Sequence, residues 1–215
     1  MTVDLSNPDP ARLLSEVTAL AARTPPGPHP VVFIGSSTFT MWSTLDADLG
    51  GIGAVNHGFG GSQLSDCIHY LDRLVLPFRP RLAVLYGGDN DLANGKSIER
   101  VLADFAEFQK RIFTALPATR IAWVSIKTSI ARRDQLPAQT TVNDTVEAAS
   151  RVDRRLSFLD IRPAMLDPDG APWPHHFLSD GLHLSPAGYA AWADILRPRF
   201  ASDPLLAAPS APPAA

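Results

Sequence analysis

The sequence contains a single cysteine, Cys67, among 215 residues, so an internal disulfide is excluded and a reducing compartment is expected. No apolar run reaches the length that a membrane span requires. The first thirty residues lack the basic start and unbroken apolar stretch of a secretory signal. A basic block is also missing, because 19 basic and 22 acidic residues are scattered along the chain. These absences predict a cytoplasmic protein with no membrane or nucleic-acid partner.

The length and the 45% hydrophobic content suit one sizeable core rather than two domains. We therefore expect a single domain over residues 1–200. Residues 201–215 are rich in proline and alanine and are predicted to form a flexible tail. The sequence gives no indication of an oligomeric state.

Short apolar runs alternate with longer segments of helical period, which is typical of a parallel sheet with helices on its faces. Strands are expected at residues 31–34, 52–55, 82–86, 121–125 and 156–159. Helices are expected at residues 10–22, 65–75, 97–116, 137–152 and 186–196. The pattern therefore predicts an α/β domain of three layers, with a five-stranded sheet between two layers of helices.

Polar segments follow the first three strands, and a fourth precedes the last helix. They are Gly35-Ser36-Ser37-Thr38, residues 56–62, residues 87–91 and Asp180-Gly181-Leu182-His183. Ligand sites of open parallel sheets lie beyond the carboxyl ends of the strands, so these segments are expected to form one site. The glycines at 58–61 do not match a phosphate-binding loop or a dinucleotide fingerprint, because the required lysine and spacing are missing.

The four segments together hold the groups that acyl transfer to a serine requires. A serine hydroxyl such as that of Ser37 is a weak nucleophile until a base removes its proton, and His183 is the candidate base. Asp180, three residues earlier, is placed to orient the imidazole. The oxyanion that forms needs preorganised donors, for which we select Gly61, Asn90 and the backbone NH of Ser37.

In these segments the sequence resembles the SGNH/GDSL hydrolases, a family named for a serine, a glycine, an asparagine and a histidine in separate blocks. The resemblance extends from Val31 to the last helix and implies a flavodoxin-like sheet with strand order 2-1-3-4-5. It also implies that Ser37 is the nucleophile, because Gly35-Ser36-Ser37 stands where the family has Gly-Asp-Ser. Ser36 in place of the usual aspartate removes a carboxylate that often shapes this loop.

The predicted function is that of a serine esterase acting on a small or short-chain ester, or on an O-acetyl group, with no cofactor. Phe59 and Trp173 are candidates for the wall of an apolar acyl pocket. The natural substrate cannot be selected from the sequence, because the family is similar in its catalytic blocks across many ester substrates.

Other interpretations stay open at this point. Ser36 is an alternative nucleophile, and a non-catalytic binding protein or an acyltransferase is compatible with the same fold. A zinc hydrolase is a further alternative, based on a cluster of metal-ligating side chains: His175, His176, Asp180 and His183.

A few further polar residues stand near the candidate site. Lys127, Arg132 and Arg133 follow the fourth strand, where a solvated loop is the default interpretation and contact with an anionic substrate the alternative. Asp91 is interpreted as a structural acceptor, and Asn143, in a helical segment, receives no role.

Overall fold

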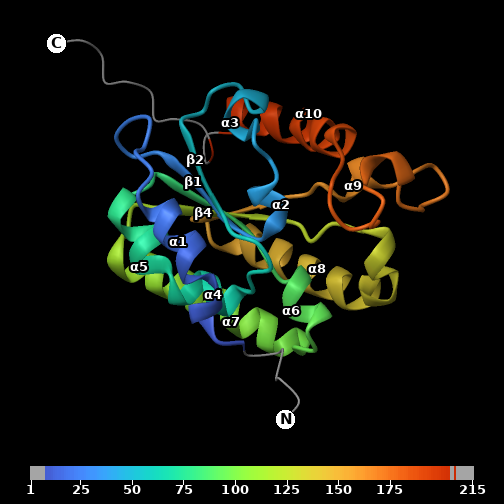
Figure 1. The fold of residues 1–215 in the computed structure, drawn as a ribbon, viewed down its shortest axis with the longest axis horizontal. Coiled ribbons are helices and arrows are strands. Elements are labelled where there is room, and N and C mark those ends of the chain that lie inside the picture. The colour runs from blue at the N-terminus through green and yellow to red at the C-terminus, as the bar shows by residue number, and fades with distance from the viewer. Residues whose placement is uncertain (1–7, 204–205, 207–215) are drawn as a thin grey trace.

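The computed structural model describes residues 8–203 and residue 206. Its centre is a parallel sheet of five strands in the order β2-β1-β3-β4-β5 (Figure 1). The strands are β1 (Val31–Gly35), β2 (Ala54–Gly58), β3 (Leu82–Tyr86), β4 (Arg120–Val124) and β5 (Leu156–Leu159). The structure confirms the three-layer α/β/α fold and the strand order that the resemblance implied.

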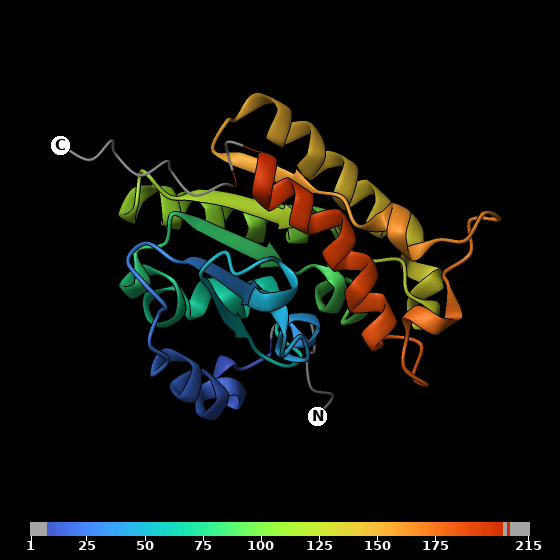
Figure 2. The same ribbon diagram turned by 90° about the horizontal axis from the view of Figure 1, so that it is seen from above.

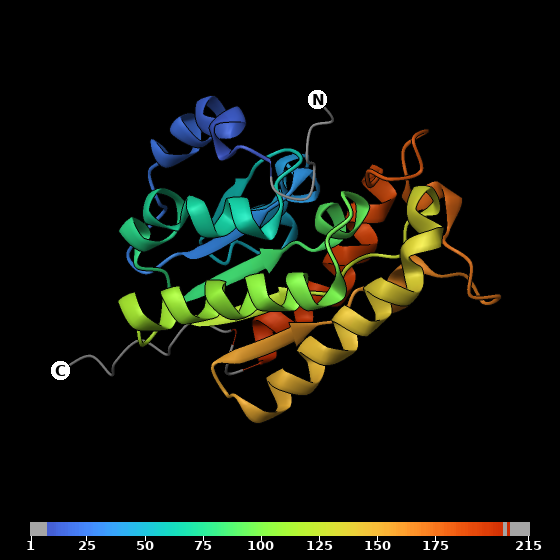
Figure 3. The same ribbon diagram turned by 90° about the horizontal axis from the view of Figure 1, so that it is seen from below.

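Helices cover both faces of the sheet (Figures 2 and 3). One face packs against α1 (Leu14–Ala21), α4 (Leu64–His69), α5 (Leu71–Leu74), α7 (Ile98–Ala115) and α8 (Leu136–Val152). The other packs against α2 (Ser37–Thr40), α3 (Leu45–Asp48), α9 (Arg162–Met165) and α10 (Pro186–Ser202). A further short α-helix, α6 (Asp89–Ala93), begins just beyond the carboxyl end of β3. All five strands point the same way, so their carboxyl ends meet at one edge of the sheet.

The sheet is held by burial of apolar side chains on both faces. Every residue of β1 and β3 is buried, as expected for central strands of a parallel sheet. Alternate residues of each strand enter the two apolar clusters: Val32 and Ile34 face the side of α7, while Val31 and Phe33 face the side of α10. Within residues 8–203, no helix combines the length and apolar composition that a membrane span requires.

The boundaries of several elements differ from the sequence prediction. The segment expected as one helix over 65–75 is divided at Tyr70 into α4 and α5. The second strand lies two to three residues later than expected and includes the polar Asn56 and His57. The last helix continues to Ser202, well beyond the expected end at 196.

Three positions of the predicted tail belong to the described fold. Residues 201 and 202 are the last turn of α10, and Leu206 is fully buried in the cluster on that face of the sheet. The rest of the predicted tail, at residues 204–205 and 207–215, lies outside the described residues.

Candidate active site

Ser37 is presented by a tight turn between β1 and α2. The strand ends at Gly35, whose φ is +148°, and a Cβ there would lie 2.0 Å from the carbonyl oxygen of Tyr86, so glycine is required. The Asn56 amide donates to the carbonyl oxygens of Phe39, at 2.7 Å, and of Trp42, at 3.3 Å. These bonds tie α2 to β2 and fix Ser37 at the carboxyl edge of the sheet.

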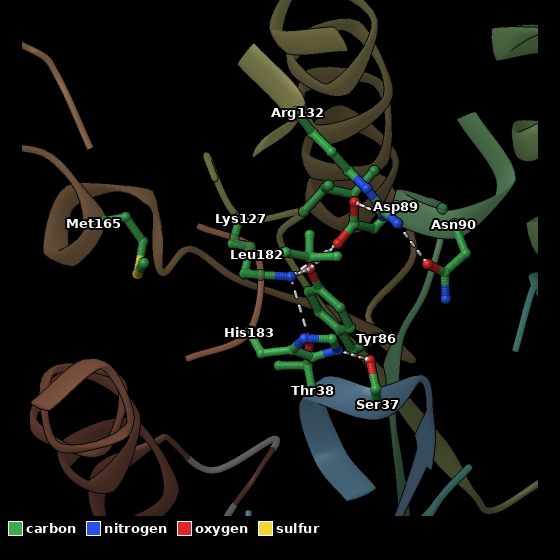
Figure 4. Close-up of polar contacts among 12 residues, drawn as sticks. Ser37, Thr38, Tyr86, Asp89, Asn90, Lys127, Arg132, Met165, Leu182 and His183 are labelled. Carbon is green, nitrogen blue, oxygen red and sulfur yellow. Dashed lines mark hydrogen bonds and ion pairs between the residues drawn. The ribbon is translucent and has the colours of Figure 1, made fainter. Parts of the chain in front are cut away.

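Ser37, His183 and Asp180 form one hydrogen-bonded row, which we call the Ser37 row. Nδ1 of His183 lies 2.6 Å from a carboxylate oxygen of Asp180. Nε2 lies 3.1 Å from the Ser37 hydroxyl oxygen, the contact drawn in Figure 4. Since a carboxylate can only accept, the imidazole proton is on Nδ1 and Nε2 is left to accept from the serine hydroxyl. Side chains that are 146 residues apart in sequence are thus placed for proton transfer.

The carboxylate of Asp180 is held by its own loop. One oxygen accepts the backbone NH groups of Leu182, at 2.8 Å, and His183, at 3.0 Å. The hydrogen bond from the His183 side chain and these two backbone bonds lower the pKa of Asp180 to about 2. The carboxylate is therefore charged at neutral pH, and 47% of its side chain is exposed to water.

The backbone NH groups of Ser37 and Gly61 are available to an anion. Within the described residues, the NH groups of Ser37 and Gly61 donate to no protein acceptor. Gly61 has a φ of +69°, in the left-handed region that favours glycine, and its turn is anchored because Glu16 accepts from the NH of Gly60 at 3.2 Å. The loop therefore offers a fixed, unpaired donor.

The amide of Asn90, at the start of α6, is held at both ends. Its nitrogen donates to the carbonyl oxygen of Ser62 at 2.9 Å, and its oxygen accepts from the guanidinium of Arg132, also at 2.9 Å. In Figure 4 the amide oxygen points to Arg132, and the nitrogen lies on the side of Ser37. One of the two N–H bonds of the amide is committed to Ser62, which leaves the other for a ligand.

A buried ionic cluster lies beside Asn90, and we call it the Asp89 cluster: Asp89, Lys127, Arg132 and Tyr86. Nζ of Lys127 lies 2.8 Å from one carboxylate oxygen of Asp89, and Arg132 pairs with the other. The Tyr86 hydroxyl donates to Asp89 at 3.0 Å. The interpretation of Lys127 as part of a solvated loop is wrong, because only 2% of its side chain is exposed.

The charges in this cluster reinforce one another. Burial alone would raise the pKa of Asp89, but the positive charges and hydrogen bonds of Lys127 and Arg132 outweigh it and lower that pKa to about 2. Burial, and then the negative charge of Asp89, raise the pKa of Tyr86 to about 12, so the phenol is neutral. Two cations thus face one carboxylate beside the candidate site.

Asn143, to which the sequence assigns no role, and Asp91 both make structural hydrogen bonds. The Asn143 side chain on α8 accepts from the NH of Ile126 at 2.8 Å and donates to its carbonyl oxygen at 3.1 Å, which fixes the loop carrying Lys127. Asp91 is buried and accepts from the backbone NH groups of Leu64 and Gly88. It therefore joins the loops before α4 and α6, as a structural acceptor would.

Of the two aromatic candidates for the pocket wall, Phe59 is contradicted by the structure and Trp173 stays a prediction. Phe59 is fully buried in the core, with its ring edge-on to Tyr70, so its assignment as a substrate contact is not supported. Trp173 is half-buried and its ring centroid lies 5.1 Å from that of His175. Nor do the histidines suit a metal, because no group of three or more His, Cys, Asp or Glu side chains in the described part of the chain is arranged to hold one.

A groove of about 540 Å³ lies between α10 and the segment that follows α2. Its lining includes Met41, one turn after Ser37, and Leu184, the neighbour of His183. Met41 and Leu178 expose 43% and 40% of their surface in this region. The groove is of the size that small-molecule sites have, and although no residue of the Ser37 row lines it, Leu184 is the sequence neighbour of His183.

Several solved structures have a similar fold. The chain has the fold of a Streptococcus pneumonia protein described as a platelet activating factor, with 20% identity, a TM-score of 0.76, and coverage of 88% of this chain and 92% of that one. It is similarly close to a GDSL-like lipase from Bacteroides thetaiotaomicron, with 19% identity, a TM-score of 0.74, and coverage of 90% and 98%. A mutant form of an acetyl-xylooligosaccharide esterase from Geobacillus has 15% identity and a TM-score of 0.61, with coverage of 82% and 94%.

These identities establish the fold alone, and a search of curated proteins gives no match. The sequence itself is more informative. The family model of the GDSL-like lipases and acylhydrolases matches residues 33–191, which include Ser37, Gly61, Asn90, Asp180 and His183. Since this match extends over most of the sequence, the chain belongs to the GDSL-like lipase/acylhydrolase family.

Proposed function

We propose that the protein is a serine esterase that hydrolyses a small or short-chain ester, or an O-acetyl group, through an acyl-enzyme on Ser37. The observation that carries this proposal is the Ser37 row, in which Asp180, His183 and Ser37 are joined by contacts of 2.6 and 3.1 Å. An imidazole with its Nδ1 proton held by a carboxylate is prepared to accept a proton at Nε2. A binding protein has no need of this arrangement.

In the first half of the reaction, the Ser37 oxygen attacks the carbonyl carbon of the ester while its proton passes to Nε2 of His183. The carbonyl oxygen becomes an oxyanion, for which the NH groups of Ser37 and Gly61 and the free N–H of Asn90 are the donors. The tetrahedral intermediate then collapses, and the departing alkoxide takes the proton from His183. The products of this half are the free alcohol and an ester on Ser37.

In the second half, a water molecule attacks the ester on Ser37, and Nε2 of His183 accepts one of its protons. The same donors hold the new oxyanion. Collapse expels the Ser37 oxygen, which regains its proton from His183, and releases the carboxylic acid. Asp180 remains ionised throughout, because its role is to orient the imidazole and to stabilise the imidazolium.

The proposed substrate class is supported by the size of the groove described above. We assign the groove lined by Met41, Leu178 and Leu184 to the non-reacting part of the substrate. Its volume of about 540 Å³ suits a small molecule rather than a polymer surface or a long lipid. The similarity in fold to an acetyl-xylooligosaccharide esterase makes an acetylated small molecule a suitable first class to test.

The test is intact-protein mass spectrometry after reaction with a fluorophosphonate, together with hydrolysis of p-nitrophenyl acetate. We expect the wild-type protein to gain one adduct and to turn over the ester, and Ser37→Ala to do neither. Ser36→Ala is the matched control, since Ser36 is 3% exposed and its side chain makes no hydrogen bond with His183 among the described residues, so labelling and turnover should persist. An unlabelled, inactive wild type would contradict the proposal.

A further inference from the structure

The orientation of the Asn90 amide decides whether it can stabilise an oxyanion. An asparagine side chain presents a nitrogen that donates and an oxygen that only accepts. If the amide were turned over, its oxygen would face both the Ser62 carbonyl oxygen and the developing negative charge. Such an arrangement would oppose the reaction, so the activity depends on what holds the amide in one orientation.

Arg132 is the group that holds the oxygen end. Its guanidinium donates to the Asn90 oxygen at 2.9 Å, and only an amide oxygen can accept that bond. At the other end, the Ser62 carbonyl oxygen can accept only from the amide nitrogen, at 2.9 Å. The two contacts select the same orientation, which leaves the second N–H of Asn90 for the oxyanion.

Arg132 is in turn held by Asp89. A guanidinium offers several N–H groups in a fixed plane, so one can bond the Asp89 carboxylate while another bonds Asn90. Asp89 cannot turn away, because Lys127 and the Tyr86 hydroxyl occupy its other oxygen at 2.8 and 3.0 Å. The side chain of Arg132 is only 15% exposed, so water competes little for these bonds.

We propose that Arg132 is a positioning residue of this esterase: anchored on Asp89, it fixes the Asn90 amide with its nitrogen toward the oxyanion. This inference rests on the proposed function, since it concerns how one donor of that reaction is oriented. Arg132 acts through Asn90 and need not touch the substrate. The arrangement differs from a merely structural ion pair in that its loss affects the transition state more than the bound substrate.

The first test is a comparison of Arg132→Ala with Arg133→Ala, measured as kcat and KM on p-nitrophenyl acetate. Arg133 is exposed and adjoins Arg132, so it is the matched control and should leave both constants unchanged. We expect Arg132→Ala to lower kcat about 10- to 100-fold with little change in KM, since removing an oxyanion donor outright costs about 10²- to 10³-fold. A kcat equal to that of the wild type would overturn the proposal.

Arg132→Lys separates position from charge. A lysine ammonium can restore the ion pair with Asp89, but a single point charge does not reproduce the planar fork that bonds Asp89 and Asn90 together. We expect the urea midpoint of Arg132→Lys to lie closer to that of the wild type than the midpoint of Arg132→Ala does, while kcat stays lowered. Full recovery of kcat would overturn the proposal, because it would show that the bond to Asn90 is not needed.

A double-mutant cycle tests whether the effect passes through Asn90. We expect Asn90→Ala combined with Arg132→Ala to be no slower than Asn90→Ala alone, because Arg132 would have nothing left to orient. Losses that multiply would overturn the proposal. An inactive wild type would instead count against the proposed function itself, whereas an active wild type with an unaffected Arg132→Ala would count only against this inference.

Discussion

Two carboxylates of the candidate site, Asp180 and Asp89, have their pKa lowered to about 2, but in opposite surroundings. Asp180 is 47% exposed and owes its low pKa to hydrogen bonds from His183 and from the backbone of its own loop. Asp89 is 4% exposed, and there burial opposes ionisation while two cations more than compensate for it. Similar pKa values therefore arise from bonds within one loop in the first case, and in the second from contacting cations that are distant in sequence.

The comparison distinguishes a carboxylate expected to act in the reaction from one expected to stabilise the fold. An exposed carboxylate can be lost at little cost to the fold, because water solvates what it leaves behind. A buried carboxylate between two cations cannot, because its loss leaves those charges unpaired in the interior. We therefore expect Asp180 to matter for catalysis and Asp89 to matter for the structure that catalysis uses.

The largest expected effect is on activity in the Ser37 row. We expect His183→Ala to lower kcat about 10⁶-fold, since no other described side chain is bonded to the Ser37 hydroxyl to accept its proton. We expect Asp180→Ala to lower it about 10⁴-fold, since the base remains but loses the carboxylate that orients it and supports its charge. Initial rates on p-nitrophenyl acetate, corrected for the Ser37→Ala background, provide the measurement. Equal losses in the two variants would break the comparison, because the exposed carboxylate would then be as indispensable as the base.

The next effect is on stability, and here the order of the two carboxylates reverses. We expect Asp89→Asn to lower the free energy of unfolding by about 3 to 5 kcal/mol, because Lys127 and Arg132 remain buried without a counter-charge. Asp180→Asn is the matched control at an exposed position and should change it by less than about 1 kcal/mol. Urea denaturation of both variants measures the difference. Similar midpoints would show that the cations of the Asp89 cluster do not depend on its carboxylate.

The same contrast between local and long-range contacts explains what the sequence could predict. The strands were identified because each is a short apolar run with polar or glycine residues at its end. The second strand was placed too early because it contains Asn56 and His57, polar residues that normally end a strand. Their polarity is satisfied by bonds from other elements: Asn56 donates to α2, and His57 bonds the Leu74 carbonyl oxygen at 2.6 Å.

The candidate site shows the same limit. Short motifs indicated Ser37, Asn90, Asp180 and His183, because each stands in a characteristic local sequence. The Asp89 cluster has no such signature, since Lys127 and Arg132 are 38 and 43 residues away from their partner. The available signal was its position, because Lys127 follows the end of β4 just as Asp89 follows the end of β3. Phe59 was misassigned because a strand-end aromatic can turn either to the site or to the core.

A third ionisable group, His57, sharpens the comparison, because burial and the nearby positive charge of Arg23 both oppose its charged form. His57 is fully buried, and this burial lowers its pKa from 6.5 to about 4, although a backbone bond to Leu74 opposes the shift. Between about pH 4 and pH 6.5, the imidazole is therefore mostly neutral in the folded protein and mostly protonated in the unfolded chain. Stability from this group is complete above pH 6.5 and is lost as the pH falls toward 4.

The loss of stability on protonation of His57 is the smallest of the expected effects, and a substitution of His57 measures it. For a shift from 6.5 to about 4, the group contributes about 2 kcal/mol of lost stability between pH 7.5 and pH 5. We expect His57→Gln to remove that part of the pH dependence, as seen in urea midpoints at the two pH values. Val55→Ala, a buried truncation on the same strand with no titratable group, should destabilise equally at both. If His57→Gln followed the wild-type pH dependence instead, the imidazole would have to be protonated in the folded protein at pH 5. Burial would then fail to suppress ionisation even where, unlike at Asp89, the nearby charge opposes ionisation too.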